Sequence, residues 1–165
     1  MSIINVVGAK IWGGGEQYVY DICKQLQQRH RTAYILVDQS NEDMQSRYAQ
    51  VGYVMTANLY TLKGFLSVNA VAKQVKAQGI DTIVCHSGKY ILFCIALKQL
   101  TGAKLVFIKH NLVPGKTDMY HRWINAQVDA FVCVSKLVYD DLMTPVIKDT
   151  SKYHVVYNGI DPNRF

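Results

Sequence analysis

Short apolar segments alternate with longer amphipathic ones along the whole chain, and this alternation constrains the fold more than any other feature. Apolar runs typical of buried strands occupy residues 3–7, 33–37, 53–55, 81–86, 104–110, 129–135 and 153–159. Most are followed by apolar side chains at helical spacing, clearest over residues 16–29, 65–75, 89–100, 117–126 and 136–143. Strands joined by such helices require right-handed crossovers. We therefore predict an α/β fold, a single Rossmann-like doubly wound parallel sheet.

The length and composition of the chain fit one domain spanning residues 1–165. Half of the 165 residues are hydrophobic and 18% are charged, which is typical of a folded globular protein. The four cysteines lie far apart inside apolar segments, without the CxxC spacing of a zinc or redox site. We expect all four, Cys23, Cys85, Cys94 and Cys133, to be buried and reduced.

The apolar runs are too short to cross a bilayer. The longest, residues 90–97, falls well short of the roughly 20 residues that a spanning helix needs, so we expect a buried helix. The N-terminal run lacks a basic leader and a cleavage site, which favours a first strand and a cytoplasmic protein.

The net charge of +6 is concentrated in the middle of the chain. Residues 61–136 carry ten basic and three acidic groups, whereas the flanking segments are nearly balanced. A solvated basic face, an anionic membrane surface or a phosphate-bearing acceptor would each account for the excess. Nucleic acid is disfavoured, because no recognition-helix or RNP signature accompanies the charge.

Candidate site residues follow the strands, because open parallel sheets bind ligands beyond the carboxyl ends of their strands. After the first strand, four residues separate Gly8 from the run Gly13, Gly14 and Gly15. That spacing departs from the GxGxxG dinucleotide fingerprint and disfavours a Rossmann oxidoreductase. Three glycines before a helix still let the backbone approach an anionic ligand, although strand-to-helix packing would also explain them.

Five ordered segments carry a family resemblance: GGGEQYVYDICKQL, DTIVCHS, LVFIKHN, DAFVCVSKLVYDDL and KYHVVYNGIDPNRF. Their order and spacing resemble the N-terminal, acceptor-side domain of family 4 of the GT-B glycosyltransferases. The resemblance covers nearly the whole chain. It implies transfer of a sugar from a nucleotide diphosphate sugar, without a metal ion or cofactor.

The resemblance implies roles for the glycine loop and for one histidine. Gly13, Gly14 and Gly15 would approach the donor diphosphate and the acceptor, with Glu16 opening the following helix. A plain helix N-terminal carboxylate would equally explain Glu16. His110 matches the fifth-strand histidine that faces the donor sugar, so it is the candidate catalytic residue, with a structural histidine as the alternative.

Four further residues are candidate acceptor or sugar contacts. His86 matches the fourth-strand histidine, and a structural role is equally open for it. Lys109 and Asn111 flank His110 and could contact a phosphate or hydroxyl, but strand alternation predicts that their side chains point away from that of His110. Ser135 lies at a strand end, where we expect it to cap the next helix.

The terminal NGIDPNRF segment resembles the family's interdomain junction, which assigns Asn158, Gly159 and Asp161 to it. The C-terminal domain that holds the nucleotide in this family, with its E-x7-E glutamates, would then be absent from this chain. We expect a fragment, or one chain of a split enzyme with a partner supplying that domain.

The combined interpretation is a glycosyltransferase acting on a lipid-linked saccharide or other cell-envelope acceptor. Basic helices around Lys63, Lys73 and Lys76 would suit peripheral contact with anionic lipid at the inner membrane face. The alternative is a non-catalytic acceptor-binding or membrane-recruiting subunit, which should expose an apolar face to its partner.

Overall fold

A computed structural model describes residues 2–60, 62–143 and 150–159 of the chain. Seven parallel strands form one sheet in the order β3-β2-β1-β4-β5-β6-β7. The strands are β1 (Ile3–Val7), β2 (Tyr34–Asp38), β3 (Tyr53–Ala57), β4 (Thr82–Cys85), β5 (Lys104–Lys109), β6 (Ala130–Cys133) and β7 (Tyr153–Val155). The predicted doubly wound parallel sheet is confirmed.

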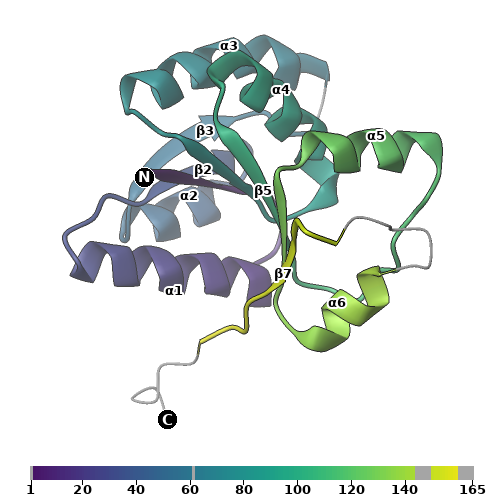
Figure 1. Cartoon of the computed structure of the whole chain (residues 1–165). Helices are drawn as coiled ribbons and strands as arrows, with labels where there is room; N and C mark the ends of the chain where they lie inside the picture. Colours follow the sequence, from purple (N-terminus) through teal and green to yellow (C-terminus); the bar gives the residue numbers. More distant parts are fainter. Residues whose placement is uncertain (1, 61, 144–149, 160–165) are drawn as a thin grey trace.

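Helices connect successive strands and cover the two faces of the sheet. They are α1 (Gly14–Gln28), α2 (Glu42–Ala49), α3 (Leu62–Ala77), α4 (Ile91–Thr101), α5 (Met119–Gln127) and α6 (Lys136–Leu142), with a 3-10 turn η1 (Gly88–Tyr90) before α4. Figure 1 shows α3 and α4 on one side of the sheet and α1 on the other. The chain therefore winds in one direction from β1 to β3 and in the other from β4 to β7.

Each face of the sheet has its own hydrophobic core. One buried cluster joins β1, β2 and the helices α1 and α2 through side chains such as Val19, Cys23 and Tyr48. The larger cluster joins the sheet to α3 and α4, with Phe93 and Leu97 among its members. The four cysteines are buried and free, as expected. The apolar residues 90–97 lie in η1 and α4 and are largely buried, also as expected.

Capping side chains explain where several helices begin. Asn41 accepts a hydrogen bond from the Met44 N–H at the start of α2. Asp118 accepts one from the His121 N–H at 3.1 Å, so α5 begins at Met119 and not at the predicted residue 117. Gly79 follows α3 with φ of +62°, the left-handed conformation that favours glycine at a helix end.

Candidate functional site

The candidate site lies where the direction of winding reverses, between β1 and β4. Ligands of open α/β sheets bind at this switch point, beyond the carboxyl ends of the strands. Here the loop after β1 leads to the glycine run, and β4 and the adjacent β5 are followed by His86 and His110. The sheet therefore brings to one rim three segments that are separated by up to a hundred positions in the sequence.

The glycine run contacts His110, which in turn contacts His86. A Cβ atom placed on Gly15 would lie 3.8 Å from Cδ2 of His110, so the helix backbone packs against the imidazole ring. Nε2 of His110 lies 3.0 Å from Nδ1 of His86, and the two rings are stacked with centroids 5.4 Å apart. The prediction that the glycine loop and His110 share one rim is confirmed.

A buried asparagine completes a row of polar groups beneath His110. Oδ1 of Asn5, in the middle of the otherwise apolar strand β1, lies 3.0 Å from Nε2 of His86. Asn5 is only 5% exposed. Both ring nitrogens of His86 therefore have protein partners, whereas no described residue hydrogen-bonds to Nδ1 of His110.

Burial keeps both imidazoles neutral. Desolvation lowers the pKa of His86 to about 3, and the neighbouring His110 adds to the lowering. Desolvation also lowers the pKa of His110 below its usual value. Near neutral pH each ring consequently has one N–H donor and one lone pair, so each can donate one hydrogen bond and accept another.

Aromatic side chains hold the glycine loop and the histidines in place. The ring of Tyr18, on α1, packs edge-on against His110 with centroids 5.2 Å apart. Trp12 precedes the glycines, packs on Tyr48 and donates from Nε1 to Gln17 at 3.1 Å. The loop is thereby tied to the helix that it introduces.

The glycine loop presents the N-terminus of α1 at the rim. The Gly13 N–H donates to Oε2 of Glu16 at 3.1 Å, so this carboxylate caps the helix. The N–H groups of Gly14 and Gly15 are the first of the helix and have no acceptor within it. Such groups, with the helix dipole behind them, favour an anion.

A cavity of about 320 Å³ adjoins the two histidines, between the end of β4, the strands β5 and β6 and the helix α5. Lys109, His110 and Asn111 all line it. Nζ of Lys109 donates to the carbonyl oxygen of Val113 at 3.5 Å, whereas the ring of His110 packs against Tyr18 and His86. That the side chains of Lys109 and Asn111 point away from that of His110 stays a prediction.

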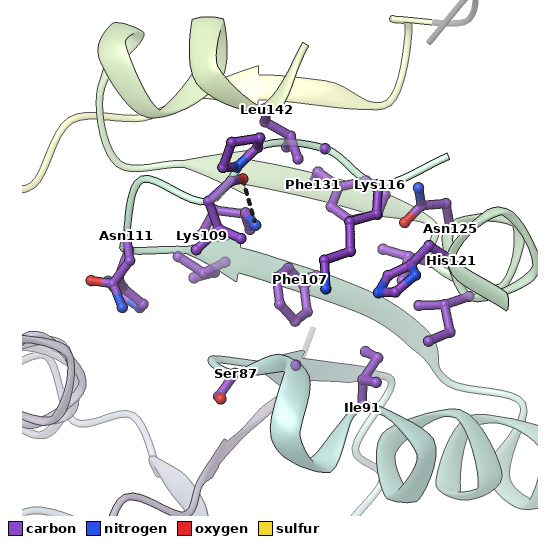
Figure 2. Close-up of a pocket in the computed structure, with 18 of the residues that line it drawn as sticks. Ser87, Ile91, Phe107, Lys109, Asn111, Lys116, His121, Asn125, Phe131 and Leu142 are labelled. Atoms are coloured by element: carbon purple, nitrogen blue, oxygen red, sulfur yellow. Dashed lines mark hydrogen bonds between the residues drawn. The ribbon is translucent and has the colours of Figure 1, made fainter. Parts of the chain in front are cut away.

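The cavity is basic. Lys109 and Lys116 line it together with Ser87, His121 and Asn125, and none of the described residues that line it is acidic. Figure 2 shows Lys116, His121 and Asn125 grouped toward one end and Asn111 at the other. Burial lowers the pKa of Lys109 and Lys116 lowers it further, whereas Cys133 and Asp141 act in the opposite direction. An anion in the cavity would relieve the repulsion between the two lysines.

The other predicted residues that the structure describes lie at a helix start and on exposed segments. Ser135 caps α6 by accepting a hydrogen bond from the Val138 N–H at 3.2 Å, as expected. Asn158 and Gly159 are exposed after β7, and Asp161 lies outside the described residues. Lys73 and Lys76 are exposed on α3, whereas the side chain of Lys63 is not described.

The described residues contain neither a cluster of metal ligands nor a helix suited to cross a membrane. No group of three or more His, Cys, Asp or Glu side chains there is arranged to hold a metal ion. Within residues 2–60, 62–143 and 150–159, no helix has the length and apolar character needed to span a membrane.

Sequence reasoning missed Asn5, Tyr18 and Trp12 as parts of the site. Asn5 could have been found, because it interrupts an otherwise apolar buried strand, where a polar side chain needs a partner. The helical spacing of Tyr18 assigns it to the core face of α1 but does not reveal that this face meets the histidines. Trp12 carries no signal in the sequence beyond its position before the glycines.

Solved structures share this fold at low sequence identity. A glycosyltransferase from Rickettsia africae matches with a TM-score of 0.81 and 19% identity, over 99% of this chain and 46% of that one. HepE from Anabaena in complex with UDP-glucose matches with a TM-score of 0.72 and 19% identity, over 99% of this chain and 45% of that one. The lipopolysaccharide outer core galactosyltransferase WaaB matches with a TM-score of 0.68 and 15% identity, over 97% of this chain and 46% of that one.

The chain thus spans about half the length of the structures that it matches, and its fold corresponds to half of a GT-B fold. It has no significant match among curated proteins. The sequence profile of Glycosyltransferase Family 4 matches residues 12–164, from Trp12 before the glycine run to beyond the last strand. The chain belongs to glycosyltransferase family 4.

Proposed function

We propose that the chain is the acceptor-side domain of an enzyme that transfers a sugar from a nucleotide diphosphate sugar. A second domain, absent from these 165 residues, would hold the nucleotide. The observation that carries the proposal is the contact of Gly15 with His110 at the switch point, beside a basic cavity. Family membership and the binding of UDP-glucose by the matched HepE structure support it.

In this proposal the rim acts by positioning and electrostatics. The N–H groups of Gly14 and Gly15 face the diphosphate as it leaves, where the helix N-terminus stabilises its developing charge. His110 contacts the sugar or the attacking hydroxyl through Nδ1. Glu16 stabilises the conformation of the glycine loop by accepting the hydrogen bond from the Gly13 N–H. We propose no resident metal or cofactor in this reaction.

The proposed acceptor carries phosphate and enters the cavity that Lys109 and Lys116 line. The two lysines line a cavity that has no lining carboxylate among the described residues, which suits an acidic group more than a neutral sugar. Asn111 and Ser87 supply hydrogen-bonding groups at the same cavity. A lipid-linked saccharide of the cell envelope has this chemistry, and the matched WaaB acts on lipopolysaccharide core.

We propose that the protein works at the cytoplasmic face of a membrane. Exposed Lys73 and Lys76 on α3 would approach anionic lipid there.

A non-catalytic recruiting subunit is the second candidate, favoured by apolar side chains beside the cavity. Leu112, Met119 and Trp123 are 55%, 87% and 49% exposed. A partner covering them would bury apolar surface. If this candidate is correct, the chain co-purifies with a donor-binding partner, and substitutions at His110 leave sugar transfer unchanged.

Lysine substitutions in the two-domain protein test the proposed acceptor. Nucleotide diphosphate release is measured with UDP-sugars as donors and a membrane lipid extract as acceptor. Lys109→Met and Lys116→Met should each raise the acceptor KM about tenfold, since one charged contact is lost. The exposed Lys24→Met serves as the matched control and should leave the KM unchanged. Equal acceptor KM values in all four proteins would refute the phosphate pocket.

A further inference from the structure

The row Asn5–His86–His110 runs from the buried centre of the sheet to the rim. We infer that Asn5 and His86 are positioning residues that fix the tautomer of His110, with the hydrogen on Nε2 and the lone pair on Nδ1. The two links are the 3.0 Å contacts of His86 with Oδ1 of Asn5 and with Nε2 of His110. The tautomer stands on this geometry alone, whereas its use in sugar transfer rests on the proposed function.

The hydrogen bond with Asn5 determines which nitrogen of His86 is protonated. Oδ1 of an asparagine can only accept a hydrogen bond, so Nε2 of the neutral His86 must carry the hydrogen. Nδ1 of His86 is then a lone pair. The alternative tautomer would place two lone pairs 3.0 Å apart inside the protein and leave both without a donor.

The hydrogen bond between His86 and His110 determines which nitrogen of His110 is protonated. Since Nδ1 of His86 accepts, Nε2 of His110 must donate to it, and the neutral ring keeps its lone pair on Nδ1. No described residue occupies that nitrogen, and His110 lines the cavity. Nδ1 of His110 can therefore accept a hydrogen bond from a hydroxyl O–H but cannot donate one.

The surroundings of the two rings reinforce the arrangement. The ring of Tyr18 packs edge-on against both imidazole rings, with its centroid 6.3 Å from that of His86 and 5.2 Å from that of His110. The backbone of Gly15 also packs against the His110 ring. A half-turn flip of the His86 ring would exchange Nδ1 with Cδ2 and Nε2 with Cε1, and both hydrogen bonds would be lost. The partner of a functional histidine commonly sets which ring nitrogen is protonated.

Two-bond ¹H–¹⁵N correlation spectra of the chain at neutral pH test the inference directly. In the wild-type protein, Nε2 should show the protonated-type ¹⁵N shift and Nδ1 the unprotonated-type shift for both His86 and His110. A proton on Nδ1 of either ring would overturn the inference. This measurement needs no substitution and no substrate.

Asn5→Leu removes the acceptor while keeping a side chain of similar size. His86 and His110 should then lose their single tautomer and show averaged ¹⁵N shifts, whereas Asn5→Asp, which retains an acceptor, should restore Nε2–H. Asn69→Leu on the exposed face of α3 is the matched control and should leave both histidines as in the wild type.

Unchanged tautomers in a folded Asn5→Leu protein would show that Asn5 does not position His110. If Asn5→Leu does not fold, the wild-type spectrum alone still decides between the two tautomers. If the wild-type spectrum shows the expected tautomers but His110→Ala keeps full activity, the proposed function is refuted and the inference about the tautomers stands.

Discussion

Acidification should destabilise the protein through His86 well before its carboxylates titrate. The pKa of His86 falls from 6.5 to about 3 on folding, because its ring nitrogens leave water and face Asn5 and His110. The folded pKa lies below the unfolded one, so the stabilisation is complete above pH 6.5 and is lost as the pH falls toward 3. Between those values the unfolded state binds more protons than the folded state.

The expected loss follows from proton linkage. Lowering the pH from about 7 to about 5.5 should reduce the free energy of unfolding by about 1.3 kcal/mol through His86 alone. The lowered pKa of His110 adds a loss of the same sign. Asp118 and Asp129, whose pKa values are lowered below 3.8, contribute only at more acidic pH.

Urea unfolding at both pH values measures the effect, and His86→Gln isolates it. The variant should lose about 1.3 kcal/mol less than the wild type between the two conditions, whatever its absolute stability. The control is His30→Asn, at an exposed position with φ of +55° that asparagine tolerates. It should keep the wild-type pH dependence. Equal pH dependence in His86→Gln and wild type would refute the argument that His86 is held neutral.

Two glycine substitutions probe the packing around the site and the sheet. Gly15→Ala should raise the free energy of unfolding by roughly 0.5–1 kcal/mol, since alanine favours the helix and its Cβ would lie at an ordinary 3.8 Å from His110. A lower free energy of unfolding in urea would mean that the His110 ring lies closer to the helix. Gly52→Ala should cost roughly 1–3 kcal/mol, because its Cβ would lie 2.6 Å from the carbonyl oxygen of Ala33. Thermal unfolding without a decrease in melting temperature would contradict that placement.

The sequence predicts the sheet well because each strand is a short apolar run bounded by polar or glycine residues. All seven expected strands are present, although those expected at residues 129–135 and 153–159 end earlier, at Cys133 and Val155. Beyond Val155, Val156 and Tyr157 are 50% and 68% exposed, which the apolar pattern alone does not detect. Helix starts depend on single caps, and Asp118 moves the beginning of α5 by two residues.

The candidate site is only partly predictable, because its geometry depends on strand register. Motif order places Gly15, His86 and His110 on one rim, and the structure places them in contact. The hydrogen bond between the histidines depends on the pairing of β4 with β5, in which Cys85 lies opposite Phe107. No sequence pattern gives that register, or the contact of Asn5 with His86 from the neighbouring strand.

The most direct measurement of the central claim is the turnover of His110→Ala in the two-domain enzyme, with nucleotide diphosphate release as the readout. If His110 contacts the reacting sugar, kcat should fall by about 100-fold or more while circular dichroism stays that of the wild type. His30→Asn, remote from the rim in sequence and exposed, should keep full turnover. A correctly folded His110→Ala enzyme with wild-type kcat would contradict the account.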